Sequence, residues 1–137
     1  MGYQFKRDIH SLNDIFEYIT AFIDNYSLDE STAFSLNLAV EELFTNIIKY
    51  NADNPNPILL NLKRLPDAVV AELIDNTEKP FNITKMPAYD PSLSLKKRPV
   101  GGLGIHLVKK MFDEIKYDYK NQQCKITLIK YLGDWDV

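Results

Sequence analysis

The sequence predicts an α+β fold: a two-layer sandwich with helices on one face of a mixed, mostly antiparallel sheet. Before about residue 51, apolar residues recur at helical spacing in two successive segments. Residues 58–75 then contain two strand-like segments joined by a tight turn, and the chain ends with a further helix and two strands. Strands joined by short turns favour antiparallel pairing, with the helices gathered on one face of the sheet.

Length and composition indicate one globular domain spanning residues 1–137. The chain is 45% hydrophobic and 26% charged, and its formal charge of −3 disfavours a charge-driven nucleic-acid function. It contains no apolar run of about 18 residues and no basic-then-apolar N-terminus, so we expect neither a membrane span nor a signal peptide. The single cysteine, Cys124, is consistent with a reducing cytoplasm and is expected to be buried in a late strand.

Two helices are expected first. Ser11 is the predicted N-cap of a helix over residues 11–25, and Asp29 that of a longer helix ending near Asn51. An Asn- and Pro-rich segment, residues 51–57, then stops the second helix. The apolar positions of the second helix are Phe34, Leu38, Leu43, Phe44, Ile47 and Ile48.

The strands follow from alternation and turn residues. Residues 58–65 and 68–75 are predicted to form a hairpin through Pro66-Asp67. Residues 78–100 have four prolines and no periodicity, which is typical of a functional lid. After a helix ending near Phe112, alternation from Ile115 indicates a strand, and a turn at Asn121-Gln122 leads into the last strand, residues 125–132.

A polar stripe on the second helix is the first candidate site. Glu42, Asn46 and Tyr50 recur every four residues and therefore share one helix face. Asn46 lies in an apolar run and needs a partner, because an unpaired buried polar group costs roughly 1–3 kcal/mol. A carboxylate and an amide one turn apart suit a Mg²⁺ ion or a reacting hydroxyl, although the same residues also fit an exposed helix face. Glu41 points about 100° away and is interpreted as a solvated charge.

A strand end and a glycine-rich loop are the other candidates. Asp75 ends an apolar strand, where its carboxylate suits an exocyclic amine but also ordinary turn chemistry. The Gly-Gly-Leu-Gly sequence at 101–104 holds three of the five glycines and opens a helix, whose N-terminus attracts anions. Its spacing matches neither a P-loop nor a dinucleotide fingerprint.

Taken in order, these motifs resemble those of the GHKL ATPase superfamily (the Bergerat fold). The resemblance covers nearly the whole chain and is greatest to the small anti-sigma-factor serine kinases. The segments that carry it are Ala39-Val40-Glu41-Glu42-Leu43-Phe44-Thr45-Asn46 for the N box, Ile74-Asp75-Asn76-Thr77-Glu78-Lys79-Pro80-Phe81 for the G1 box, and Gly101-Gly102-Leu103-Gly104-Ile105-His106-Leu107-Val108 for the G2 box.

The resemblance implies a role for each matching residue. Glu42 is the implied general base for the attacking hydroxyl, Asn46 the Mg²⁺ ligand, and Asp75 the acceptor for the adenine amino group. The backbone around Gly102, Leu103 and Gly104 is implied to hold the phosphates of ATP.

Two basic residues have both a functional and an ordinary interpretation. Lys49 is placed by the resemblance near a phosphate, but it is equally typical of a solvated helix end. Arg98 in the lid suits a terminal-phosphate contact on lid closure, or simply a loop that needs charge.

Two positions depart from the family pattern. Thr77 stands where the G1 box usually has glycine, and its Cβ restricts positive φ and the approach of adenine, although its hydroxyl offers a replacement hydrogen bond. Tyr50 stands where these kinases often have histidine.

The resemblance predicts an ATP- and Mg²⁺-dependent serine/threonine protein kinase in a partner-switching module. Its expected partners are a sigma factor and a small antagonist protein that it phosphorylates, and a homodimer is implied. No nucleic acid or membrane partner is expected. One alternative is a non-catalytic binding module of the same fold with weak or lost nucleotide binding, which Thr77 favours. Another is a domain severed from a larger phosphatase or sensor.

Overall fold

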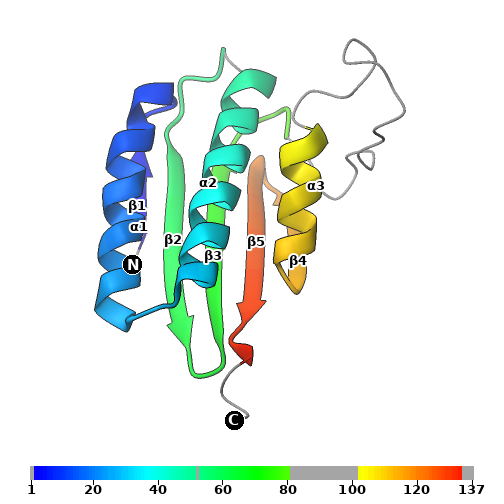
Figure 1. Cartoon of the computed structure of the whole chain (residues 1–137). Coiled ribbons are helices and arrows are strands. Elements are labelled where there is room, and N and C mark those ends of the chain that lie inside the picture. Colours follow the sequence, from blue (N-terminus) through cyan, green and yellow to red (C-terminus); the bar gives the residue numbers. More distant parts are fainter. Residues whose placement is uncertain (1, 52, 81–101, 134–137) are drawn as a thin grey trace.

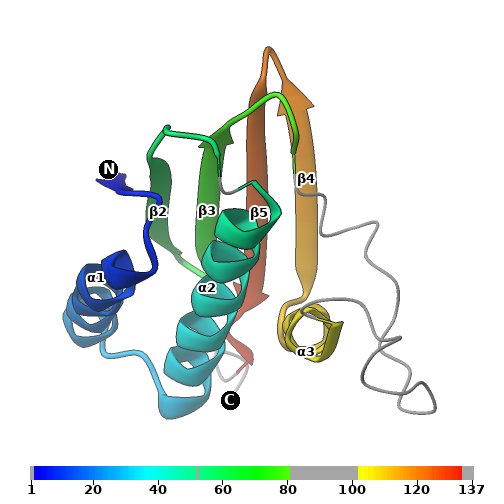
Figure 2. The same cartoon turned by 90° about the horizontal axis from the view of Figure 1, so that it is seen from above.

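A computed structural model describes residues 2–51, 53–80 and 102–133. In this part of the chain, three α-helices cover one face of a five-stranded sheet, and the other face carries no helix (Figures 1 and 2). The predicted two-layer α+β fold is therefore confirmed. Within the same residues, no helix is both long enough and apolar enough to cross a membrane.

The helices are α1 (Leu12–Tyr26), α2 (Glu30–Tyr50) and α3 (Gly102–Met111). Asp29 caps α2 as predicted: its carboxylate accepts a hydrogen bond from the backbone N–H of Thr32 at 2.8 Å. Ser11 occupies the N-cap position of α1 as predicted, but its side chain makes no capping hydrogen bond. A short 3₁₀ turn, η1 (Ile9–Ser11), precedes α1, and its cap is Asp8.

The strands are β1 (Tyr3–Phe5), β2 (Ile58–Leu65), β3 (Ala68–Asn76), β4 (Glu114–Lys120) and β5 (Gln123–Tyr131), in the sheet order β1-β2-β3-β5-β4. The prediction missed β1, because three residues are too few to show alternation. Every pairing among these strands is antiparallel, so the mixed sheet that we expected is not observed. The two hairpins, β2–β3 and β4–β5, account for two of the four pairings.

Both predicted turns are present. Residues 66–67 join β2 to β3, and residues 121–122 join β4 to β5. Asn121 and Gln122 have φ values of 53° and 60°, the left-handed conformation required at both centre positions of a type I′ hairpin turn. This turn directs the β4–β5 hairpin back past the end of β3.

The core lies between the helical layer and the sheet, and α2 contributes much of it. The orientation of α2 corrects one expectation, since Phe34 is 61% exposed whereas Leu36 is fully buried. Two residues apart on a helix is a rotation of about 200°, so these side chains lie on nearly opposite faces. The buried residues of α2 are Thr32, Ser35, Leu36, Ala39, Val40, Leu43, Phe44, Asn46 and Ile47.

Three chain segments with predicted site residues meet at one end of the molecule. The C-terminal half of α2, the N-terminus of α3 and the end of β3 all lie toward the upper end of Figure 1. The fold therefore brings the Glu42/Asn46 stripe, the glycine-rich helix start and Asp75 to the same region.

Candidate functional site

Glu42 of α2 lies directly against Gly104 in the first turn of α3. A Cβ atom built on Gly104 would overlap the carboxylate carbon and both carboxylate oxygens of Glu42. Only glycine therefore leaves room for the carboxylate at this place. An anionic group near the first turn of a helix is stabilised by the free N–H groups and the positive end of the dipole.

The protonation of Glu42 is altered by its surroundings. Burial raises the pKa of its carboxyl group, and the neighbouring charge of Glu41 raises it further. Lys49 and the Asn46 side chain act in the opposite direction. A carboxylate with a raised pKa accepts protons more readily at neutral pH, as general-base chemistry requires. Glu41 itself is exposed, as predicted.

Asn46 is buried, with 6% of its surface exposed. Its side-chain Nδ2 donates a hydrogen bond to the backbone carbonyl oxygen of Glu42 at 2.6 Å. The expected partner of this polar side chain is thus its own helix. Because the amide nitrogen is committed to the backbone, Oδ1 is the atom that remains to accept a donor or ligate a cation. Lys49 lies in the last turn of α2 and is exposed.

Asp75 is 3% exposed and forms an ion pair with Arg7, a residue that the sequence did not single out. The Arg7 side chain is as deeply buried as that of Asp75, and its Nε donates to the carbonyl oxygen of Asn56 at 3.1 Å. The one available signal was an arginine between two apolar residues, Phe5 and Ile9, near the start of the chain.

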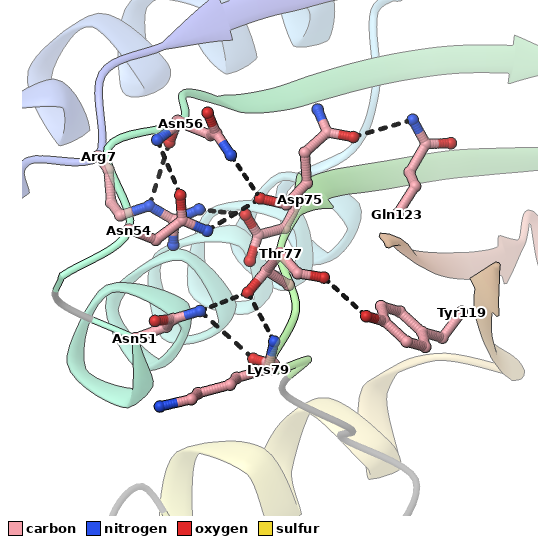
Figure 3. A network of polar contacts seen from close by, with 10 residues as sticks. Arg7, Asn51, Asn54, Asn56, Asp75, Thr77, Lys79, Tyr119 and Gln123 are labelled. Carbon is pink, nitrogen blue, oxygen red and sulfur yellow. Dashed lines mark hydrogen bonds and ion pairs between the residues drawn. The ribbon is translucent and has the colours of Figure 1, made fainter. Parts of the chain in front are cut away.

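Thr77 is held without backbone strain, contrary to the expectation for its glycine-like position. Its φ is not positive, and its hydroxyl oxygen accepts hydrogen bonds from Asn51 Nδ2 and from the backbone N–H of Lys79, the latter at 3.0 Å. Its own N–H donates to the carbonyl of Gln122 at 2.8 Å. Its carbonyl accepts from the hydroxyl of Tyr119, also at 2.8 Å (Figure 3). The threonine side chain therefore fixes the segment that leaves β3.

A polar pocket of about 490 Å³ opens next to this network. It adjoins Thr77 but is not lined by Glu42, Asn46 or Asp75, so it extends the site without containing the predicted chemistry. Asparagine side chains dominate its wall, which consists of Asn51, Asp53, Asn54, Pro55, Asn56, Asn76, Thr77, Glu78, Lys79, Asn121 and Gln122.

The structure describes the glycine-rich segment from Gly102 onward, but not Arg98. Gly102 begins α3, with Leu103 and Gly104 in its first turn, so the glycine-rich segment does open a helix. Arg98 and most of the expected lid, residues 81–100, lie outside the described residues. Cys124 is buried as expected, and burial is the main cause that raises the pKa of its thiol to about 11. Burial and a raised pKa are the features of a structural cysteine rather than of a reactive thiol.

The fold and the site together define a class. The helices form one layer on an antiparallel sheet, as in GHKL-type ATPase domains. The helix with Glu42 and Asn46 packs on the helix that begins with the glycine-rich segment, and a buried acid, Asp75, lies near the end of a strand. These features are also those of a GHKL-type ATPase domain. Residues 5–130 match the sequence family described as the histidine kinase-like ATPase domain, and the chain belongs to that family.

Similarity to known proteins is illustrated by a curated relative and a solved structure. The serine-protein kinase RsbW of Bacillus velezensis is 28% identical over 103 residues, which cover 72% of this chain and 64% of the length of RsbW. In the solved structure of the SiaB–SiaC complex from Pseudomonas aeruginosa, one chain superposes with a TM-score of 0.66 at 13% identity. That alignment covers 96% of this chain and 88% of the other, and it supports the shared fold.

Proposed function

We propose that this protein is an ATP-dependent serine/threonine protein kinase that acts as an anti-sigma factor in a partner-switching module. The contact between Glu42 and Gly104 is the observation that carries the proposal, since it sets a proton acceptor beside a helix N-terminus suited to phosphate. The similarity to a protein named a serine-protein kinase supports the same activity. The similarity to a chain of a two-protein complex supports a protein partner, which we propose to be a small antagonist protein that is phosphorylated.

The described residues fit Mg·ATP. The backbone N–H groups at the start of α3 suit a phosphate, and the Glu42 carboxylate occupies the place beside them that a Cβ on Gly104 would fill. Asn46 Oδ1 is a neutral oxygen ligand of the kind that Mg²⁺ accepts. Asp75 is a buried acceptor for the adenine amino group, and Thr77 bounds the same region.

The proposed reaction moves one phosphoryl group to a serine hydroxyl. Glu42 accepts the hydroxyl proton, the serine oxygen forms a bond to the γ-phosphorus, and the bond from that phosphorus to the bridging oxygen breaks, so that ADP leaves. Bound Mg²⁺ supplies charge neutralisation. Lys49 and Arg98 are proposed phosphate contacts, and a sigma factor and a second copy of the chain are proposed binding partners.

One observation favours a second candidate, a non-catalytic binding module of the same fold. Arg7 already pairs with one carboxylate oxygen of Asp75, and the Thr77 hydroxyl already accepts two hydrogen bonds within the chain, so both side chains have partners before any ligand arrives. A measurement of Mg·ATP binding distinguishes the kinase from the non-catalytic binding module.

Calorimetric titration with Mg·ATP is the first test. We expect the native protein to bind, and Asn46→Ala to lose most of the affinity with the loss of a metal ligand. Asn37→Ala is the matched control, because Asn37 lies on the same helix and also donates from Nδ2 to the carbonyl four residues earlier, at 3.0 Å. No binding by the native protein would overturn the kinase proposal.

The second test measures chemistry at saturating nucleotide. A protein retained by the immobilised chain is incubated with γ-labelled ATP, and phosphoserine is quantified in a single turnover. We expect Glu42→Gln to slow transfer by on the order of 10²–10⁴ with little change in nucleotide affinity. Glu41→Gln, one residue away on an exposed position, should transfer near the native rate. Native transfer by Glu42→Gln would exclude it as the base.

A further inference from the structure

The ion pair between Arg7 and Asp75 is buried at both ends. The exposed fractions of the two side chains are 3% and 4%, and the Nη2 of Arg7 donates to Oδ1 of Asp75. Arg7 follows β1, whereas Asp75 lies near the end of β3. The pair therefore joins the N-terminal segment to the strand that carries the proposed base-binding acid (Figure 3).

The arginine is itself held in place. Its Nε donates to the carbonyl oxygen of Asn56, and the Asn56 side chain donates to the carbonyl of Asn76 at 2.9 Å. The Asn54 side chain donates to the same Asn76 carbonyl, also at 2.9 Å. The guanidinium is thus held by Asp75 and by the Asn56 carbonyl. The loop that contains Asn54 and Asn56 also anchors Asn76, the residue after Asp75.

This arrangement leaves two groups without partners. Oδ1 of Asp75 accepts from Arg7, whereas no described residue donates a hydrogen bond to Oδ2. The Nη1 of Arg7 is a buried donor that also lacks a partner. Buried polar groups in native proteins are nearly always paired, and an exception is often found where a ligand or water completes the bonding.

From this geometry we propose that Arg7 is a specificity-determining residue of the base site, acting through Asp75. By engaging Oδ1, it fixes the carboxylate so that Oδ2 is the single acceptor presented to a ligand. The ligand chemistry that fits is a purine with an amino group at C6. The inference rests on the proposed function, in which Asp75 meets the base of a nucleoside triphosphate.

The test compares ATP with purine riboside 5′-triphosphate, which lacks only the 6-amino group. We expect the native protein to bind ATP about 10- to 100-fold more tightly, the effect of one hydrogen bond to a charged group. In Arg7→Gln the carboxylate loses its fixed orientation. The ratio of the two dissociation constants should then fall to within about threefold, while purine riboside triphosphate keeps its native affinity.

Two further variants make the result decisive. Arg7→Lys keeps the charge but not the planar fork, and we expect it to restore part of the discrimination. Arg64→Gln is the matched control on β2, where the arginine donates to the neighbouring Leu65 carbonyl, and it should keep the native ratio. Thermal melting monitored by circular dichroism establishes that each variant is folded.

Different failures are distinguishable. Native discrimination that persists unchanged in both Arg7 variants, or an equal loss of affinity for both nucleotides, would overturn this inference and leave the kinase proposal standing. Failure of both Arg7 variants to fold would assign the arginine a structural role and would also overturn it. If the native protein bound neither nucleotide, the proposed function would fail with it.

Discussion

At the scale of single residues, the contact of Glu42 with Gly104 joins a proton acceptor to the start of α3. The contact depends on the absence of one side chain, because any Cβ at position 104 takes the space of the carboxylate. Its neighbour Asn46 is oriented by a hydrogen bond to the Glu42 backbone. The geometry of the proposed chemistry is therefore set by two residues on α2 and one missing Cβ on α3.

Replacement of Gly104 by alanine should separate folding from function. The atoms in the way form the flexible end of Glu42, which can move aside, and alanine favours a helix over glycine by roughly 1 kcal/mol. We therefore expect little loss in the free energy of unfolding but a loss of phosphoryl transfer comparable to that of Glu42→Gln. Gly133→Ala is the control, since a Cβ there has no heavy atom within 4 Å. Native transfer by Gly104→Ala would show that the position of Glu42 is unimportant.

Glu42 should also leave a signature in the pH dependence of stability. Its pKa is raised above its ordinary value of 4.5, mainly by burial, so the folded state binds the proton more tightly than the unfolded state. Relative to Glu42→Gln, the native protein should therefore lose stability as the pH rises from about 4.5 to the raised pKa, and then level off. Urea unfolding between about pH 4 and 8 measures this difference.

A control substitution makes that profile specific. Glu17 lies on the exposed side of α1. The difference in the free energy of unfolding between the native protein and Glu17→Gln should not show the pH dependence expected for Glu42→Gln. A constant difference between native protein and Glu42→Gln across the range would contradict the buried position of the carboxylate.

At the scale of elements, the junction after β3 is fastened to three other parts of the chain. Thr77 bonds to Asn51 at the end of α2, to Gln122 in the β4–β5 turn and to Tyr119 on β4. The bond to Asn51 depends on the threonine hydroxyl, whereas the bonds to Gln122 and Tyr119 use the backbone of residue 77. The segment that follows, the expected lid, begins from this fixed point.

Thr77→Val should destabilise this junction. The substitution keeps the shape of the side chain but removes the acceptor used by Asn51 Nδ2 and the Lys79 N–H, and Thr77 is only 5% exposed. Leaving buried donors unpaired should cost about 1–3 kcal/mol in the free energy of unfolding. Denaturant titration checks this, with Thr77→Ser as the variant that keeps the hydroxyl and most of the stability. Equal stability of the valine and serine variants would be the contrary result.

At the scale of the whole molecule, the pair of Arg7 and Asp75 links residues 68 positions apart. It connects the segment that follows β1 with the central strand of the sheet, β3, at the end where the proposed site lies. Buried ion pairs add little net stability compared with apolar residues, but removal of one partner leaves an uncompensated charge. We therefore expect the N-terminal segment to be necessary to the proposed site.

Asp75→Asn should accordingly destabilise the entire fold. We expect a loss of about 3–5 kcal/mol in the free energy of unfolding, because the Arg7 charge stays buried without its partner. The double variant Arg7→Met with Asp75→Asn should cost less than the sum of the single changes, which a double-mutant cycle measures. Asp118→Asn, at an exposed position on β4, is the control. Additive effects would show that the two side chains do not interact.

The sequence by itself determined the local structure of this protein. Periodicity placed α1, α2 and the strands from β2 onward, Asp29 gave the start of α2, and the residues at 66–67 and 121–122 gave the two turns. These features depend on interactions within a few residues, so they are encoded where they occur. The ordered motifs around Glu42, Asn46 and Asp75 also indicated the family, which the match over residues 5–130 confirms.

Only the tertiary structure decided which side chains meet. The pairing of Arg7 with Asp75, the seating of Glu42 on Gly104 and the anchoring of Thr77 by Asn51 all join distant segments. The exposure of Phe34 follows from the rotation of α2 against the sheet, and β1 is a strand only because β2 pairs with it. Helix rotation and strand register are set by the packing of the whole core, and no local pattern in the chain records that packing.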